Sequence, residues 1–384
     1  MTSVHPLPPL PEIPVRIARL DAIVLRCPIE TPVRTSFGTM RDRPAVFVRV
    51  EDADGAVGWG ETWCNFPACG AEHRARLLET VVAPLVVGIP FASPAAAYDA
   101  MTRATAVLAI QSGEHGPLAQ AIAGVDLALW DLTARRRREP LWRLLGGRSD
   151  RVEVYASGIN PDRPEAVAAA RRSAGYRAFK LKVGFDDARD LHNVAALREL
   201  LGADAALMVD ANQGWSFEQA ERQVRALEPY RLGWIEEPLR ADRLAAEWSA
   251  LAAAAATPIA AGENLMGFDA FDEAIAARRY AVVQPDIAKW GGISGCWPVI
   301  ERVRTAGLRY CPHYLGAGVG LAASAHLLAA VGGDGLLEVD ANPNPLRSAL
   351  CPHLEAVEDG FALLGDAPGI GIEVDPVRLN SLCR

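Results

Sequence analysis

Apolar and polar residues alternate most sharply in the segment Ala178–Gly184, where Lys180 and Lys182 are interleaved with three apolar residues. In a β-strand, side chains at positions i and i+2 share a face, so the two lysines point one way and the apolar side chains the other. A buried ammonium group is costly unless an anion faces it. A solvent-facing edge strand would also tolerate two lysines. The alternative is a buried strand whose lysine face meets something anionic.

From residue 152 onward, short apolar runs alternate with segments of helical periodicity. Eight strands separated by helices predict a closed parallel barrel of the TIM type, in the α/β class. The expected strands are Val152–Ser157, Ala178–Gly184, Ala206–Asp210, Gly233–Glu236, Ile259–Ala261, Ala281–Pro285, Leu308–Pro312 and Leu336–Val339.

The segment before the barrel has a different pattern. Three expected strands (Ile17–Cys27, Ala45–Glu51 and Ala56–Glu61) precede three expected helices (Ala71–Val87, Pro94–Ile110 and Pro117–Arg137). Strands followed by helices predict a compact α+β domain. We therefore expect an α+β capping domain over residues 1–145, with a loose tail at 1–15, a barrel over 146–353, and a C-terminal segment, 354–384, that returns to the capping domain.

Composition and charge narrow the function classes. The chain has 384 residues, half of them hydrophobic, and a net charge of −8. The one basic run, Arg135–Arg138, ends a predicted helix, where cations suit the helix dipole, so nucleic acid is an unexpected partner. No apolar stretch is long enough to span a membrane, and the proline-rich N-terminus does not resemble a signal peptide.

The seven cysteines are scattered, odd in number and contain no CxxC pair. This pattern predicts neither a disulfide framework nor a zinc knuckle, and it fits a reducing cytoplasm.

A polar residue stands at the C-terminal end of seven successive barrel strands, and each lies 23 to 28 residues after the previous one. That step is one βα unit, so all seven side chains should meet at the mouth of the barrel, where enzymes of this fold carry out their chemistry. The seven are Lys182, Asp210, Glu236, Glu263, Asp286, His313 and Glu338.

Asp210, Glu236 and Glu263 lie on consecutive strands and form an all-oxygen set. Hard oxygen ligands without cysteine or histidine favour Mg²⁺ over zinc. The alternative is that each carboxylate caps a helix or pairs with a lysine. By strand order Lys182 stands on one side of this set and His313 on the other, with Asp286 placed to orient the imidazole.

These motifs together resemble the enolase superfamily, specifically the mandelate racemase/muconate lactonizing enzyme family, over nearly the whole chain. An aspartate–histidine pair such as Asp286 and His313 resembles the mandelate racemase subgroup, whereas muconate-lactonizing types use a lysine near the place of Lys289. The matching signatures are Lys180-x-Lys182, Asp210-x-Asn212, Ile235–Pro238, Gly262-Glu263, Pro285-Asp286 with Gly291-Gly292, Pro312-His313 and Glu338.

The resemblance implies Mg²⁺-dependent removal of the proton α to a carboxylate, through an ene-diolate. Lys182 would be the base, with its pKa lowered by Lys180 and the metal, and Lys180 would bind the substrate carboxylate. Glu338 would hydrogen-bond that carboxylate if protonated, or position the site if ionised.

Two reactions would use the same residues. One is dehydration of an acid sugar or related hydroxy acid, and the other is racemisation or epimerisation of a 2-hydroxy acid. We favour dehydration because family members with the aspartate–histidine dyad resemble hydro-lyases more often. A Schiff-base aldolase with Lys182 as nucleophile would leave the three carboxylates unexplained. A non-catalytic Mg²⁺-binding barrel would leave the acid–base residues unexplained.

Substrate recognition is expected on two loops of the capping domain, Pro28–Pro44 as a flap and Trp63–Gly70, which can close over the barrel mouth. Asn212 at the mouth is a further candidate for binding substrate. The expected partner is a small-molecule carboxylate, and we also expect a homo-oligomer in the cytoplasm. Candidate specificity residues on the capping domain are Arg34, Trp63, Asn65 and His73.

Overall fold

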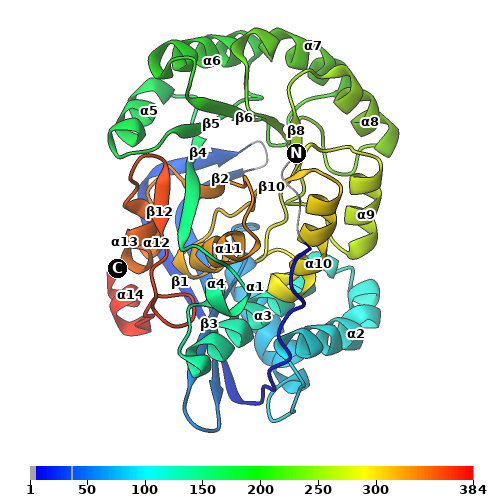
Figure 1. Ribbon diagram of the computed structural model, residues 1–384, viewed down its shortest axis with the longest axis vertical. Helices are drawn as coiled ribbons and strands as arrows, with labels where there is room; N and C mark the ends of the chain where they lie inside the picture. The colour runs from blue at the N-terminus through cyan, green and yellow to red at the C-terminus, as the bar shows by residue number, and fades with distance from the viewer. Residues whose placement is uncertain (1–5, 36–37, 384) are drawn as a thin grey trace.

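A computed structural model describes residues 6–35 and 38–383, in which a parallel barrel is covered by a smaller N-terminal domain (Figure 1). The strand order β10-β9-β8-β7-β6-β5-β4-β11 is parallel throughout. The described parts of β10 and β11 share no ladder pairs, and Leu336 N donates instead to Cys311 Sγ at 3.4 Å. The strands are β4 (Arg151–Ile159), β5 (Ala178–Lys182), β6 (Ala206–Asp210), β7 (Ile235–Glu236), β8 (Ile259–Ala261), β9 (Val282–Val283), β10 (Arg309–Tyr310) and β11 (Leu337–Asp340).

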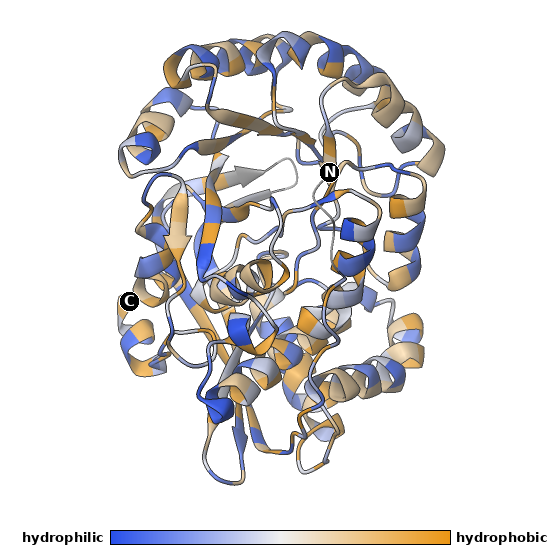
Figure 2. Ribbon diagram, in the orientation of Figure 1, coloured by the Kyte–Doolittle hydropathy of each residue, from blue (hydrophilic) through white to orange (hydrophobic). Residues whose placement is uncertain are grey.

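Helices cover the outside of this sheet, and in Figure 2 those along its top mix hydrophilic and hydrophobic stretches, as expected for helices with one face on a core. The predicted barrel fold with eight parallel strands is confirmed, although no ladder pairs join the described parts of β10 and β11. The predicted bounds of β6, β8 and α7 match the structure at both ends. The barrel helices are α5 (Pro164–Ser173), α6 (Asp187–Leu201), α7 (Phe217–Leu227), α8 (Ala245–Ala254), α9 (Phe268–Ala276), α10 (Gly292–Thr305) and α11 (Gly318–Val331), with η3 (Glu228–Tyr230) after α7.

The barrel interior is closed below the mouth by one apolar layer. Each of the eight strands or its flanking residues contributes one buried side chain to it, among them Tyr155, Trp234 and Ala178. Lys180 and Lys182 follow Ala178 on the same face of β5, whereas Phe179 and Leu181 pack outward in the main core. The alternation of β5 therefore directs both lysines into the barrel, above the apolar layer.

The capping domain is an antiparallel sheet, in the order β1-β2-β3, packed on helices. β1 and β2 pair far beyond the predicted ends, with Val33 opposite Met40 and a register shift between Pro28 and Val33. The described parts of the predicted flap, residues 28–35 and 38–44, thus form a two-stranded extension of the sheet, which we call the arm. The polar and proline-rich composition of this segment had predicted a loop. Pairing between the two strands instead satisfies its backbone N–H and C=O groups. The elements are β1 (Ile17–Thr35), β2 (Gly38–Asp52), β3 (Val57–Thr62), α1 (Gly70–Leu77), η1 (Leu78–Val82), η2 (Ala83–Leu85), α2 (Pro94–Ser112) and α3 (His115–Arg137), followed by α4 (Leu141–Leu144).

Two buried carboxylates of the capping domain bind the N-termini of barrel helices. Asp126 on α3 accepts from Ile293 N (2.7 Å), Ser294 N (3.0 Å) and Ser294 Oγ (2.5 Å) at the start of α10. Glu61 on β3 accepts from Ala317 N (2.6 Å) and Gly320 N (2.9 Å) at the start of α11. The first N–H groups of a helix have no partner within it and favour an anion, so these contacts fix the cap on the barrel.

We expect Asp126→Ala to lower the free energy of unfolding by about 3 kcal/mol, because three buried donors lose their acceptor. Urea unfolding followed by tryptophan fluorescence measures this loss. The matched control is Asp99→Ala, since Asp99 is an exposed carboxylate on α2 that lies 4.0 Å from Arg103. Its effect should stay within about 0.5 kcal/mol. Equal effects of the two substitutions would show that the Asp126 contacts do not hold the domains together.

The C-terminal segment packs on both parts of the molecule. β12 pairs antiparallel with β4, and Ile370 N donates to Asp131 Oδ1 of α3 at 2.8 Å. The last helix, α14, lies against β1 (Figure 1). The remaining elements are α12 (Pro345–Leu350), α13 (Pro352–Glu355), β12 (Phe361–Leu363) and α14 (Pro376–Leu382).

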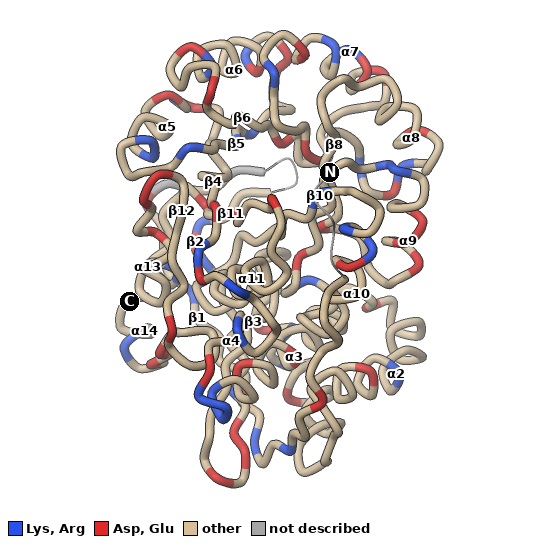
Figure 3. The backbone as a smooth tube through the Cα atoms, in the orientation of Figure 1, with Lys and Arg blue, Asp and Glu red and all other residues tan. Residues whose placement is uncertain are grey.

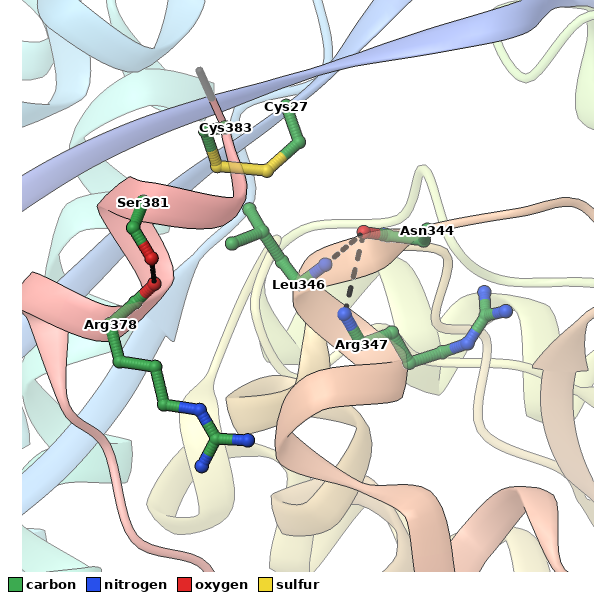
Figure 4. Close-up of a disulfide and its surroundings, with 7 residues drawn as sticks. All are labelled: Cys27, Asn344, Leu346, Arg347, Arg378, Ser381 and Cys383. Carbon is green, nitrogen blue, oxygen red and sulfur yellow. Dashed lines mark hydrogen bonds between the residues drawn. A yellow bond between two sulfur atoms is a disulfide. The ribbon is translucent and has the colours of Figure 1, made fainter.

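Cys27 of β1 forms a disulfide with Cys383, directly after α14 (Figure 4). The cysteine pattern had predicted no disulfide framework, and this single bond was not foreseen. The two cysteines are 356 residues apart, and counting and spacing in the sequence cannot reveal a pair that only the tertiary fold brings together. The other five cysteines are free, and of these only Cys69 is exposed.

The N-terminal tail is also better fixed than predicted. Within the described part of the tail, Pro8 O accepts a hydrogen bond from Trp297 Nε1 of α10 at 3.0 Å, and Leu7 and Leu10 pack against the main core. Val15 pairs with Phe91 as an isolated bridge. Residues 6–15 thus run along the surface of the fold.

Lys and Arg residues are interspersed with Asp and Glu residues along the tube of Figure 3. None of the helices in residues 6–35 and 38–383 is long and apolar enough to cross a membrane.

Candidate active site

A cavity of about 290 Å³ lies between the arm of the capping domain and the C-terminal ends of the barrel strands. Six of the predicted site residues line it: Lys182, Asn212, Glu263, His313, Trp63 and Asn65. Five others lie buried beside it, at most 3% exposed: Lys180, Asp210, Glu236, Asp286 and Glu338. The strand-end residues therefore come together as their spacing predicted.

Lys180 is an ionic centre beneath the cavity. Its Nζ lies 2.5 Å from Glu236 Oε1 and 2.7 Å from Glu338 Oε1. Burial lowers the pKa of Lys180, but these two carboxylates outweigh burial and hold that pKa well above its usual value. Lys180 is not among the described residues that line the cavity. In this structure it holds Glu236 and Glu338 in place, and its binding of the substrate carboxylate stays a prediction.

Glu338 is fully buried and held on both oxygens. Oε1 accepts from Ser157 Oγ at 2.5 Å and from Lys180, and Oε2 accepts from Tyr314 N at 2.8 Å. Burial raises the pKa of Glu338, but the charges of Lys180 and His313 bring it below its usual value. Of the two roles expected for Glu338, its contacts favour the ionised, positioning one.

Lys182 faces the cavity from the end of β5 and is 3% exposed. Burial is the main cause that lowers its pKa below the usual value. The charges of Lys180 and Arg43 lower that pKa further, whereas Asp210 and Asp340 raise it. The lowered pKa of Lys182 agrees with the expectation from the sequence, but its main cause is desolvation and not the neighbouring Lys180.

His313 follows β10 and forms the predicted dyad with Asp286. Nδ1 of His313 lies 2.7 Å from Asp286 Oδ2, while Asp286 Oδ1 accepts from Ala288 N at 2.8 Å and Lys289 N at 3.1 Å. Nε2 of His313 lies 2.6 Å from Glu263 Oε2. Burial lowers the pKa of His313, but Glu263, Glu338 and Asp286 together hold it well above its usual value.

Three carboxylates at adjacent strand ends repel one another in a buried site. Asp210 on β6 lies opposite Glu236 on β7 and opposite Lys182 on β5, so the three residues stand side by side on neighbouring strands. Burial and then the nearby charge of Glu263 raise the pKa of Asp210. Burial and then Asp210 and Glu338 raise the pKa of Glu236 to about 7.

Among the described residues, no three acidic, histidine or cysteine side chains converge closely enough to hold a metal in this conformation. The carboxylates turn instead toward protein donors: Lys180 for Glu236, Lys289 and His313 for Glu263, and the amide of Asn212 for Asp210. Mutually repelling, buried oxygen donors with no thiolate among them nevertheless suit a hard divalent cation.

Several cavity residues were missed from the sequence. The polar ones come from the capping domain (Arg43), from residues just after strand ends (Gln213 and Asn264), and from the end of β11 (Asp340 and Asn342); the apolar ones are Val33, Met40, Phe66 and Leu315. A signal was present for two of them, since Asp340-Ala341-Asn342 repeats the tripeptide Asp210-Ala211-Asn212 at another strand end.

Lys289, predicted as an alternative to the dyad, also lines the cavity. Its Nζ lies 3.2 Å from Glu263 Oε1, 2.7 Å from Asn264 Oδ1 and 5.0 Å from the centre of a Trp63 ring. Both Lys289 and His313 thus contact Glu263 at the same side of the cavity.

Two guesses for the capping domain have different outcomes. His73 lies on α1, where its Nε2 is 2.9 Å from Glu114 Oε1, and it is not among the described lining residues, so that guess was wrong. Arg34 pairs with Thr39 through the backbone of the arm, and its side chain lies outside the part that the structure describes.

Two family models match the chain. The model for the enolase C-terminal domain-like fold covers residues 163–378, and that for the mandelate racemase/muconate lactonizing enzyme N-terminal domain covers residues 19–146. The chain belongs to the mandelate racemase/muconate lactonizing enzyme family. It is an enzyme of this family, with the barrel and N-terminal cap that the sequence predicted.

Relatives with stated activities include 3,6-anhydro-alpha-L-galactonate cycloisomerase from Streptomyces coelicolor, which is 34% identical over 95% of this chain and 99% of its own. Arabinonate dehydratase from Saccharolobus solfataricus is 29% identical over 86% of this chain and 88% of its own.

Solved structures of family members are also similar. A mandelate racemase/muconate lactonizing enzyme from Bordetella bronchiseptica has a TM-score of 0.92 and 60% identity, covering 97% of this chain and all of its own. A Streptomyces coelicolor racemase with bound magnesium has a TM-score of 0.84 and 33% identity, covering 96% of this chain and 100% of its own. L-talarate/galactarate dehydratase, solved as a variant liganded with Mg and L-glucarate, has a TM-score of 0.85 and 29% identity, covering 96% of this chain and 92% of its own.

Proposed function

We propose that this family member removes the α-proton of an acid sugar in a Mg²⁺-dependent reaction and then eliminates the β-oxygen, as a dehydratase. The observation that carries the proposal is that Lys182 and His313 line one cavity with Glu263. Lys182 comes from β5 and His313 from the end of β10. Around the barrel, β10 is three strands from β5 in one direction and five strands from it in the other.

Asp210, Glu236 and Glu263 would hold the cation, as the chemistry of their oxygen donors supports. When bound, it supplies the positive charge that stabilises an ene-diolate. Two of the similar structures carry magnesium by name, which supports the same assignment here.

Lys182 has the burial and the lowered pKa that a neutral amine base needs. His313, held by Asp286, has a raised pKa and can donate a proton to a leaving oxygen on the other side of the cavity. If the leaving oxygen belongs to a ring instead of a free hydroxyl, the same two residues open the ring, which is a cycloisomerisation. If His313 returns a proton to the α-carbon, the result is racemisation, the runner-up reaction.

The lining of the cavity favours a polyhydroxylated substrate. Amide side chains, which both donate and accept hydrogen bonds, alternate with an apolar wall that includes Val33, Met40 and Leu315. The amides are Asn65, Asn212, Gln213, Asn264 and Asn342.

The test is a screen of C4–C6 acid sugars with Mg²⁺, reading both 2-keto-3-deoxy products and solvent deuterium at the α-carbon. Elimination products support the dehydratase, and exchange with inversion but no elimination supports the racemase. The absence of any exchange across the library would refute the proposal.

We also propose that the enzyme is a homo-oligomer in the cytoplasm. The Cys27–Cys383 disulfide argues against the cytoplasm, because disulfides are rare in cytosolic proteins. Alkylation of thiols at the moment of cell lysis decides this point. A cytoplasmic enzyme should show both cysteines alkylated, and protection of both would argue for an oxidising compartment. Light scattering measures the oligomeric state.

A further inference from the structure

The end of β11 repeats the Asp-Ala-Asn tripeptide at the end of β6, and in both units the asparagine bonds the aspartate. In the first Asp-Ala-Asn unit, Asn212 donates through N to Asp210 Oδ1 at 2.7 Å and through Nδ2 to Asp210 Oδ2 at 2.9 Å. In the second, Asn342 donates through N and Nδ2 to Asp340 Oδ1, at 2.9 and 2.7 Å. Both units thus present an aspartate, held by the asparagine two residues later, at the barrel mouth.

The two aspartates meet opposite environments. Asp210 lies among other carboxylates, whereas Asp340 Oδ2 lies 2.7 Å from Nη2 of Arg43 and 3.8 Å from Nη1 of Arg347. Burial raises the pKa of Asp340, but the two guanidinium groups outweigh burial and hold it below its usual value. The second unit is therefore an ionised acceptor balanced by cations, and not a second site for a metal.

Arg43 is the contact between the capping domain and this unit. It lies on β2 at the base of the arm and is 3% exposed. Besides Asp340, its Nε donates to Pro343 O at 3.1 Å, directly after Asn342. The orientation of the Asp340 carboxylate thus depends on the cap being seated on the barrel.

Asp340 also shares a wall of the cavity with Lys182. Gly158 of β4 has φ +68°, and a Cβ added there would lie 3.1 Å from Asp340 Oδ1 and 3.8 Å from Lys182 Cε. Asp340, Arg43 and Lys182 all line the cavity. A substrate whose α-proton faces Lys182 would therefore bring its neighbouring carbons close to Asp340.

We infer that Asp340 is a specificity-determining residue whose carboxylate accepts a hydrogen bond from a substrate hydroxyl on the Lys182 side, and that Arg43 is its positioning residue. Three hydrogen bonds, two from Asn342 and one from Arg43, occupy the carboxylate, which has about four acceptor positions. Among the described residues, Oδ2 accepts one hydrogen bond, from Arg43, and Arg347 Nη1 lies 3.8 Å from it without bonding it. Oδ2 can therefore accept one further hydrogen bond, from a ligand. This inference rests on the proposed function, because it assumes a hydroxylated acid as substrate.

The experiment compares aldonic acids that differ at one hydroxyl, as epimer pairs and deoxy analogues, with Mg²⁺ present. In the Asp340→Asn variant, we expect the kcat/KM ratio between the best acid and its counterpart lacking that hydroxyl to fall by about 10- to 100-fold, mainly through KM. Arg43→Lys keeps the charge but shortens the reach, so it should move the ratio in the same direction by less.

Glu355→Gln is the matched control. Glu355 bonds Arg347 Nε at 2.7 Å on the side away from Asp340, and it does not line the described cavity. The substrate preference of the Glu355→Gln variant should equal that of the wild type. Thermal unfolding midpoints confirm that each variant is folded, and Arg43→Lys provides the test if Asp340→Asn does not fold.

The outcomes separate the two proposals. If the wild type exchanges no α-proton with any of the acids, both the proposed function and this inference are refuted. If the wild type is active and folded Asp340→Asn and Arg43→Lys keep the wild-type preference at every hydroxyl, this inference alone is refuted, and the Arg43–Asp340 pair only joins the cap to the barrel.

Discussion

In D₂O, the His313→Asn variant is expected to exchange the α-proton of only those substrates whose proton faces Lys182. Asparagine keeps much of the volume of histidine but cannot act as an acid or base near neutral pH. Lys182 remains in the cavity wall, so deuterium should still enter from its side. Net dehydration or racemisation should fall by about 10²- to 10⁴-fold, the usual contribution of a general acid or base. Proton NMR of each enantiomer measures the exchange.

The reciprocal variant is Lys182→Ala. It should lose exchange of the α-proton that faces Lys182 and keep exchange of the α-proton that faces His313. Asp286→Asn should reproduce the loss of His313→Asn more mildly, because it disturbs the imidazole contact at 2.7 Å without removing the ring. If His313→Asn leaves exchange of both enantiomers intact, His313 is structural. Lys289 would then be the first candidate for the second base, since it lines the same side of the cavity.

Removal of the metal should have an effect of similar size. With excess EDTA, turnover should fall to background and return on addition of Mg²⁺. Asp210→Asn should lose both metal binding and activity, because a neutral amide is a far weaker ligand than a carboxylate for a hard cation. Isothermal calorimetry with Mg²⁺ alone provides a readout that does not depend on turnover.

The chain offers its own control for that substitution. Asp340→Asn makes the same change in the other Asp-Ala-Asn unit, where guanidinium groups and not carboxylates face the aspartate. This variant should bind Mg²⁺ like the wild type. Full activity in excess EDTA, or equal loss of Mg²⁺ binding in both variants, would contradict the assignment of Asp210 as a ligand.

The barrel and the strand-end residues could be predicted because both follow from local periodicity. A strand's side chains alternate, and one βα unit occupies a near-constant length of chain, so Lys182, Asp210 and Glu236 had to fall into one row once the barrel was inferred. The dyad of His313 and Asp286 followed from the same register.

Features that depend on which distant segments meet were not predictable in this way. Arg43 meets Asp340 across 297 residues of sequence, and neither has a local pattern that names its partner. The arm looked like a loop because its proline and polar residues hide a pairing that only the opposite strand completes. The contacts of Lys180 with Glu236 and Glu338 likewise depend on three separate strands.

The bond between Cys27 and Cys383 closes residues 27–383 into a covalent ring. Cutting the backbone once in an exposed loop, such as that at residues 202–205 between α6 and β6, would leave one molecule of almost unchanged mass. The two pieces would separate only after a reductant is added. New chain ends could therefore be introduced at such a loop without freeing any part of the fold, as long as the sulfurs stay joined.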